Sequence, residues 1–303
     1  MANISKANVV YFSGTGGTEL AARTIYDNLI EKGIDAALKS ISVNDKTALA
    51  PCDMMFFLYP VHAGDASEAV YQFIRTFVNV PVPMTDCVVL SVSAGGEAIL
   101  NTAARSKVIR KLLKKGFKTV YEDMIVMPNN FVTAYSDNLS GLLLNALPIK
   151  IKYIVDQAAS GVKLKKNSKI IDSFLRTVCE PFKLFVKLNG KFLKADDKCT
   201  GCGHCAQICP RGNIRMENSR PVFEWQCVMC MKCVYQCPAD AIGNIMTDPI
   251  KVKGGYDIEK MKALAQNIQF TEENILKETP EASYAAIRKY LLGALDIIKE
   301  NHD

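Results

Sequence analysis

Short apolar runs alternate with amphipathic stretches over the first 130 residues of the chain. Each run is bounded by turn-forming residues and has the length of a strand that is buried on both faces of a sheet. The predicted strands are 9–12, 34–41, 54–59, 88–92 and 120–126. The predicted helices between them are 18–32, 67–77 and 98–115. This alternation predicts an α/β fold with a doubly wound parallel sheet of strand order 2-1-3-4-5.

The apolar pattern changes after residue 137. Runs of Leu, Ile and Lys over 137–190 predict helices that Pro148 and Pro181 interrupt. Thr279 and Pro280 predict the start of another helix, since Pro is favoured in a first turn and Thr can cap it. The apolar face of this helix, from Tyr284 to Ile298, is expected to pack on its own chain, with a homodimer or partner contact as the alternative.

Length and composition fit a folded protein of more than one domain. The chain has 303 residues, 49% of them hydrophobic and 22% charged, which argues against a disordered or fibrous protein. It begins without the pattern of a secretory signal, and its longest apolar run, 54–61, falls far short of the roughly 20 residues that span a bilayer. We therefore expect a cytoplasmic protein with no membrane span. The expected parts are an α/β domain (1–160), a basic helical linker (161–190), a cysteine-governed domain (191–250) and a helical C-terminal extension (251–303).

Eight of the 11 cysteines fall between Cys199 and Cys237. In a reducing cytoplasm, thiols at this density indicate metal ligation rather than disulfides. The spacing Cys-x2-Cys-x2-Cys-x3-Cys-Pro occurs twice, at an offset of 28 residues, so two copies of one small unit are predicted. The other cysteines, Cys52, Cys87 and Cys179, are expected to be buried structural thiols.

Both copies follow the run that binds 4Fe-4S clusters in bacterial two-cluster proteins. The first three cysteines of a run hold three corners of one cubane, and the fourth ligates the other cluster. The first cluster is therefore assigned to Cys199, Cys202, Cys205 and Cys237, and the second to Cys227, Cys230, Cys233 and Cys209. Two zinc sites are the alternative, which the spacing disfavours because zinc ribbons use separated pairs of cysteines.

A glycine-rich loop follows the first predicted strand and leads directly into a helix. Its residues are Ser13, Gly14, Thr15, Gly16, Gly17 and Thr18. Backbone amides and hydroxyls that converge at a helix N-terminus favour a phosphate dianion. The loop matches neither a Walker A motif nor a dinucleotide fingerprint. It suits the monophosphate of FMN, and a tight structural turn is the alternative.

Two more loops follow predicted strands, and such loops meet at the edge of a doubly wound sheet where ligands bind. One comprises Tyr59, Pro60, Val61, His62, Ala63 and Gly64, and the other Ser93, Ala94, Gly95 and Gly96. Their small residues let the backbone approach a flat ring and tune a flavin. Tyr59 and His62 are expected either to pack on that ring or to fill ordinary core or loop space.

These segments resemble two known families. The three N-terminal loops resemble those of flavodoxins, and the segment from Cys199 to Cys237 resembles a two-cluster bacterial ferredoxin, a small α+β domain. Their fusion in this order is similar to the ferrodoxin family of anaerobes over about residues 5–250. The resemblance implies a flavodoxin-like sheet, FMN between the three loops and two 4Fe-4S clusters. The chain departs from the T-G-N-T loop of flavodoxins at Gly17, which removes a side-chain hydrogen bonder.

The formal net charge of +6 is concentrated in residues 161–195, which hold nine Lys and Arg against two Asp and Glu. No nucleic-acid-binding motif accompanies the segment, so we expect no nucleic-acid partner and interpret it as a solvated helix or linker. Its charge could also steer acidic redox partners, such as ferredoxin or a downstream reductase.

Clusters exchange one electron at a time and FMN one or two. Their presence on one chain predicts an electron carrier or oxidoreductase component that links a low-potential one-electron donor, two clusters and FMN. One alternative is an FMN-dependent reductase of a quinone, enone or nitro compound, for which His62 is the only candidate proton donor. Another is a redox sensor. No catalytic residue is assigned, and no hydrolytic constellation is visible.

Overall fold

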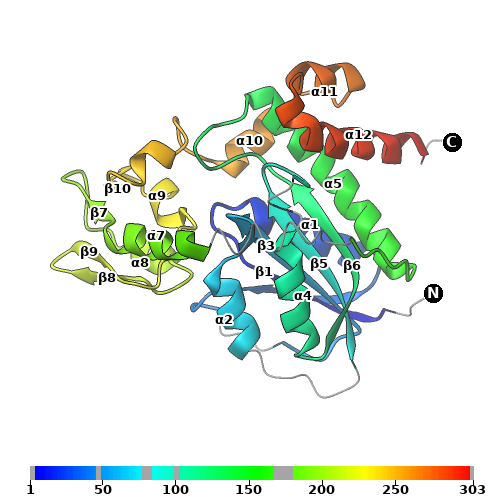
Figure 1. Ribbon diagram of the computed structural model, residues 1–303, viewed down its shortest axis with the longest axis horizontal. Helices are drawn as coiled ribbons and strands as arrows, with labels where there is room; N and C mark the ends of the chain where they lie inside the picture. The colour runs from blue at the N-terminus through cyan, green and yellow to red at the C-terminus, as the bar shows by residue number, and fades with distance from the viewer. Residues whose placement is uncertain are drawn as a thin grey trace.

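The computed structural model describes residues 4–45, 49–76, 84–98, 101, 103–166 and 180–300. Figure 1 shows a parallel sheet between helices, a smaller cysteine-rich segment beside it, and C-terminal helices packed next to it. The long strands are β1 (Lys6–Tyr11), β2 (Asp35–Ser40), β3 (Met54–His62), β5 (Thr85–Ser93) and β6 (Phe117–Val126). The helices of this part are α1 (Gly17–Glu31), α2 (Glu68–Thr76), α4 (Ser106–Leu113) and α5 (Asp137–Ala159), with a short 3-10 turn, η1 (Ala103–Arg105), before α4.

The five long strands are all parallel and are ordered β2-β1-β3-β5-β6. The two-residue β4 (Asp65–Ala66) pairs antiparallel with the end of β3 and lies off this path. Numbered along the chain, the long strands have the order 2-1-3-4-5, which confirms the predicted flavodoxin-like fold class. Ligands of such sheets bind at the carboxyl ends of the strands beside the switch point, here β1 and β3.

Side chains of each strand alternate between two helical layers. In β1 and just beyond it, Val9 and Tyr11 belong to the core with α1 and α5, whereas Val10 and Phe12 belong to the core with α2 and α4. Both faces of the sheet are therefore covered, which is why its central strands β1, β3 and β5 contain buried apolar runs. The predicted helix over 98–115 contains only the 3-10 turn and α4 among its described residues.

The prediction that Pro148 interrupts a helix is wrong, whereas that for Pro181 stays a prediction, because residues 167–179 lie outside the described residues. Pro148 lies inside α5, which continues on both sides of it. This helix packs on the sheet along one side and on C-terminal helices along another, and that burial outweighs the local cost of Pro. Pro181 lies in α7 (Glu180–Lys191). The preceding residues 167–179, which include Cys179, lie outside the described residues.

The C-terminal helices pack against α5 of the same chain (Figure 1). They are α10 (Ile258–Ala265), α11 (Glu272–Glu278) and α12 (Ala285–Glu300), with a 3-10 turn, η3 (Ala282–Tyr284), before α12. Ile287 and Leu291 of α12 are buried in one core with Leu142 of α5. The apolar face of α12 is therefore covered by its own chain rather than offered to a second copy.

The predicted start of the last helix is wrong in one respect. Thr279 ends α11 rather than capping the next helix, and its hydroxyl donates to the carbonyl oxygen of Ile275 at 2.6 Å. The chain then makes η3 before α12 begins at Ala285.

The cysteine-rich segment is a small α+β unit. Its elements are β7 (Lys194–Ala195), α8 (His204–Ile208), β8 (Ile214–Glu217), β9 (Arg220–Phe223), α9 (Lys232–Tyr235), β10 (Ile242–Gly243) and η2 (Asp248–Ile250). Two short antiparallel pairs, β8 with β9 and β10 with β7, hold it together around a small apolar core. In the parts of the chain described above, no helix has the length and apolar character needed to cross a bilayer.

Some cations of the basic segment 161–195 are used within the chain. Lys166 pairs with Glu97 and Asp123, and Lys191 pairs with Glu224. These two charges stabilise the fold locally, so they contribute less to attracting a partner than the sequence count suggests.

Candidate functional site

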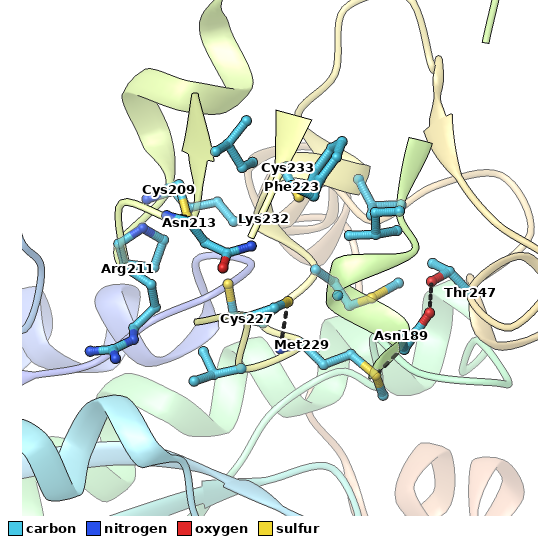
Figure 2. Close-up of a pocket in the computed structure, with 18 residues that line it drawn as sticks. Asn189, Cys209, Arg211, Asn213, Phe223, Cys227, Met229, Lys232, Cys233 and Thr247 are labelled. Carbon is cyan, nitrogen blue, oxygen red and sulfur yellow. Dashed lines mark hydrogen bonds between the residues drawn. The ribbon is translucent and has the colours of Figure 1, made fainter. Parts of the chain in front are cut away.

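Two cavities in the cysteine-rich segment are each lined by four cysteines. Cys209, Cys227, Cys230 and Cys233 line one of about 510 Å³, part of which Figure 2 shows. Cys199, Cys202, Cys205 and Cys237 line the other, of about 360 Å³. Each set takes three cysteines from one copy of the run and the fourth from the other copy. The structure thus brings together the two sets named from the sequence, while their ligation of clusters stays a prediction.

The cysteines are spread around these cavities rather than gathered at a point. Among the described residues, no three His, Cys, Asp or Glu side chains converge closely enough to hold a single metal ion. A zinc ion would need its thiolates at about 2.3 Å. The preference for a cubane over zinc rests on the spacing of the cysteines in the sequence.

The two copies share one backbone conformation between their ligands. Gly201 and Gly203 have φ angles of 72° and 73°, and the equivalent Met229 and Met231 have φ angles of 51° and 61°. Glycine adopts this left-handed region freely, whereas a methionine there costs on the order of 1–3 kcal/mol. The second loop therefore carries strain that its surroundings must hold, as is typical of ligand-binding loops.

Backbone N–H groups point at several of the sulfurs. Those of Asn213 and Met229 donate to Cys209 and Cys227 at 3.3 Å, and that of Ala241 donates to Cys237 at 3.4 Å. Such bonds favour a thiolate and tune the potential of a cluster that it ligates.

The two cavities differ in their access to solvent. Cys202 is exposed, and hydrogen bonds, that of the His204 backbone first, lower the pKa of its thiol. Burial raises the pKa of the Cys230 thiol to about 12. The first set therefore opens toward solvent at Cys202, whereas the second set is turned toward the sheet domain.

A third cavity, of about 510 Å³, lies at the carboxyl ends of β1, β3 and β5, where a doubly wound sheet binds its ligand. Ten of the sequence-predicted flavin residues line it: Ser13, Gly14, Thr15, Gly17, Thr18, Pro60, Val61, His62, Ser93 and Ala94.

The other predicted flavin residues do not line this cavity. They are Gly16, Tyr59, Ala63, Gly64, Gly95 and Gly96. Tyr59 takes the alternative of core packing: it lies within β3, which continues to His62, and its buried side chain donates to the carbonyl oxygen of Ala104 at 3.2 Å. Gly16 and Gly96 face Ile258 and Ala286 of the C-terminal segment instead.

The sequence interpretation missed six lining residues. They are Val92, Met127, Pro128, Asn130, Cys230 and Tyr256. Met127, Pro128 and Asn130 follow β6, and the rule that strand ends share one edge of the sheet could have found them. Cys230 and Tyr256 come from the two C-terminal segments, and no sequence pattern shows where those segments dock.

Cys230 joins the second cysteine set to this third cavity, since it lines both. A Cβ built on Gly14 would lie only 2.2 Å from the carbonyl oxygen of Cys230. Only glycine therefore allows the two loops to come this close.

The surrounding contacts dock the two parts firmly. Val228 is buried in the sheet core with Val10 and Phe57, and its backbone is hydrogen-bonded to the His62 ring. Farther out, the backbone N–H of Val43 donates to the Pro210 carbonyl at 3.0 Å. The loop of the second cysteine set is therefore packed into the sheet domain, and not merely tethered to it.

A buried ion network supports the third predicted loop. Arg105, only 1% exposed, donates to Glu97, Glu122 and Ser91 at 3.0, 3.1 and 2.8 Å. Asn101 donates to the Ser93 hydroxyl and to the Gly96 carbonyl at 2.8 and 2.9 Å. These bonds fix the loop from Ser93 to Glu97 at the end of β5.

Comparisons with known proteins match the cysteine-rich segment first. The family model of the 4Fe-4S dicluster domain matches residues 191–238. A ferredoxin of Methanothermococcus thermolithotrophicus is 40% identical over 50 residues, which cover 15% of this chain and 83% of that protein. NADH-quinone oxidoreductase subunit I 2 of Symbiobacterium thermophilum is 32% identical over 92 residues, or 26% of this chain, and the match spans only 34% of that protein's length.

Solved structures resemble the other half of the chain. The flavodoxin of Streptococcus pneumoniae TIGR4 is similar over 52% of this chain and 99% of that one, with 14% identity and a TM-score of 0.39. The flavodoxin-like character of the sheet rests on its own strand order. Through its cysteine-rich segment, the chain belongs to the ferredoxin family.

Proposed function

We propose that this protein is an iron-sulfur flavoprotein that passes electrons between a low-potential one-electron donor, two 4Fe-4S clusters and FMN. Electron transfer as such follows from the ferredoxin segment. The joint use of clusters and FMN is the part that we propose. It is carried by one observation, the position of Cys230 in both the second cysteine cavity and the cavity of the sheet domain.

The chemistry belongs to the bound groups, because clusters exchange single electrons and FMN exchanges one or two. The protein contributes binding and position. Four thiols around each cavity would hold a cluster, and the hydroxyls of Ser13, Thr15 and Thr18 at the start of α1 would hold the phosphate of FMN. Gly14 lets the Cys230 backbone close against the flavin loop.

The arrangement gives the protein an outer and an inner face. Exposed Cys202 marks where an external redox protein could approach the first set of cysteines. Val228, packed in the sheet core, keeps solvent away from the contact of the second set with the sheet domain. We therefore propose that the donor, a ferredoxin-like redox protein, approaches near Cys202.

Direct reduction of a small molecule on the flavin has less support. Its candidate proton donor, His62, is hydrogen-bonded to the backbone of Val228, and burial lowers its pKa to about 4. The ring is therefore neutral near pH 7 and engaged in the contact between the two segments. This role is structural, and it does not favour His62 as an acid.

We also keep the four-part organisation, 1–160, 161–190, 191–250 and 251–303, as a proposal, together with a cytoplasmic location. The location is supported by eight clustered thiols that need a reducing compartment.

The test compares wild-type protein with Cys230→Ala and Cys52→Ala under anaerobic conditions. Cys52 is a thiol of the sheet core outside both cysteine sets, so its variant controls for loss of a sulfur. With reduced ferredoxin as donor, wild type and Cys52→Ala should show bleaching of the flavin. Cys230→Ala should keep its FMN but bleach at least tenfold more slowly, while dithionite still reduces it. Bleaching of Cys230→Ala at the wild-type rate would contradict the proposed route.

A further inference from the structure

The C-terminal segment reaches the cavity proposed for FMN through Tyr256. Only 7% of this residue is exposed, and it lines the cavity beside the start of α1. Its hydroxyl donates to the carbonyl oxygen of Pro128 at 3.3 Å and is hydrogen-bonded to the side chain of Thr15. The phenol is therefore a polar group held against the glycine-rich loop.

The phenol of Tyr256 lies beside Gly17. A Cβ built on Gly17 would lie 3.6 Å from the Tyr256 hydroxyl oxygen and 3.5 Å from Cε of Met127. A side chain at position 17 would thus touch a hydrogen-bond donor that comes from a distant part of the chain.

The residues after Tyr256 hold it in place. A Cβ on Gly16 would lie 2.9 Å from Cγ2 of Ile258, so Ile258 closes tightly over the same loop. Asp257 caps α10, where its carboxylate accepts from the backbone N–H groups of Glu259 and Lys260 at 3.0 and 3.1 Å. The turn that carries Tyr256 is therefore fixed on both sides.

The cavity would have to bind a phosphate without a cationic side chain. None of the described residues that line it is a lysine or an arginine. A dianion there depends on the N-terminus of α1 and on neutral donors. Beside the start of α1, the side-chain donors are the hydroxyls of Ser13, Thr15 and Thr18, the amide of Asn130 and the phenol of Tyr256, while His62 and Ser93 line the cavity at the ends of β3 and β5. With so few donors, the loss of one should be measurable.

We propose that Tyr256 donates a hydrogen bond to the phosphate of FMN, so that the C-terminal segment completes the phosphate subsite. The inference rests on the proposed binding of FMN. The phenol O–H would leave the Pro128 carbonyl, and because 3.3 Å is long for an O–H···O bond, this exchange gives up little. A bond to a charged phosphate is stronger.

The test measures the binding of FMN and of riboflavin, which lacks the phosphate, to flavin-free protein with its clusters intact. Tyr256→Phe removes only the hydroxyl, and Tyr290→Phe is the control, since Tyr290 is a buried tyrosine of α12 that does not line the cavity. Tyr256→Phe should raise the Kd for FMN by about 10- to 100-fold, as expected for a lost bond to a charged group. Its Kd for riboflavin should stay within about twofold of wild type, and Tyr290→Phe should change neither.

A second variant keeps the test decisive. Gly17→Asn placed in Tyr256→Phe supplies an amide donor from the loop itself, and should restore at least part of the FMN affinity without changing that for riboflavin. An unchanged Kd for FMN in Tyr256→Phe, or equal losses for FMN and riboflavin, would overturn the role of Tyr256 but leave the proposed function standing. Wild-type protein that bound neither flavin would refute both.

Discussion

Gly14→Ala tests the contact between the glycine-rich loop and the second cysteine loop. The added Cβ would lie 2.2 Å from the carbonyl oxygen of Cys230, whereas a carbon and an oxygen normally approach to about 3.3 Å. The loops must therefore separate by about 1 Å. No positive φ is recorded for Gly14, so backbone strain does not add to this effect.

Overpacking of this kind lowers the free energy of unfolding by about 1–3 kcal/mol. At roughly 2–4 °C for each kcal/mol, the midpoint of thermal unfolding should fall by about 2–12 °C. The assay is anaerobic thermal unfolding of the loaded protein, followed by the absorbance of the clusters, together with the rate of flavin bleaching by reduced ferredoxin. Both the midpoint and the rate should fall, because the same 1 Å opens the contact at Cys230.

Gly293→Ala is the matched control. Its Cβ would have no neighbour closer than 3.8 Å, and it lies inside α12, where Ala is the better helix former. Its midpoint should be unchanged or slightly higher. If Gly14→Ala matched this control in both the midpoint and the bleaching rate, Cys230 could not lie against Gly14 as described.

Three further predictions concern stability. Arg105→Met should lower the free energy of unfolding by about 3–5 kcal/mol, because it leaves Glu122 buried without its partner. Arg23→Met, at the exposed pair with Glu19, should lower it by at most about 1 kcal/mol. Urea unfolding measures both. Leu291→Ala should lower the free energy of unfolding by about 2–5 kcal/mol and speed the hydrogen exchange of the α12 amides. Leu276→Ala, on the exposed side of α11, should change the free energy of unfolding little. His62 has a folded pKa of about 4 against about 6.5 when unfolded, so the unfolded chain binds more protons between these values. The contribution of His62 to the free energy of unfolding should therefore be complete above pH 6.5 and fall by up to about 3 kcal/mol toward pH 4. Thermal midpoints of His62→Phe should depend less on pH over this range than those of the wild type.

The sheet and the cysteine sets could be predicted because their determinants are local or periodic. Short apolar runs, turn-forming ends and helical periodicity encode the parallel sheet, and the repeated cysteine spacing encodes two matching loops. The ends of the helices are predicted less well than the strands, because tertiary packing decides where a helix begins and ends. Pro148 shows this most clearly, because burial on two sides carries α5 through it.

The docking of the C-terminal segments could not be predicted. Neither Cys230 nor Tyr256 carries a local signal that it lines a cavity of the sheet domain, because their positions depend on contacts more than 100 residues apart in sequence, such as that of Tyr235 with the Asn130 carbonyl. For Tyr59, the sequence leaves flavin contact and core packing as alternatives for a different reason. The apolar pattern of the sequence does not show that β3 continues to His62 or that the Tyr59 side chain lies in the core.

The central claim is that the clusters and the flavin exchange electrons within one chain, across the contact at Cys230. It is tested most directly by rapid anaerobic reduction of the loaded protein with a limiting amount of reduced ferredoxin, followed by the rate of flavin bleaching at several protein concentrations. Transfer within the chain predicts a first-order rate that is the same at every concentration once the clusters are reduced. A rate that rises in proportion to protein concentration would mean that electrons pass between molecules, and would contradict the account.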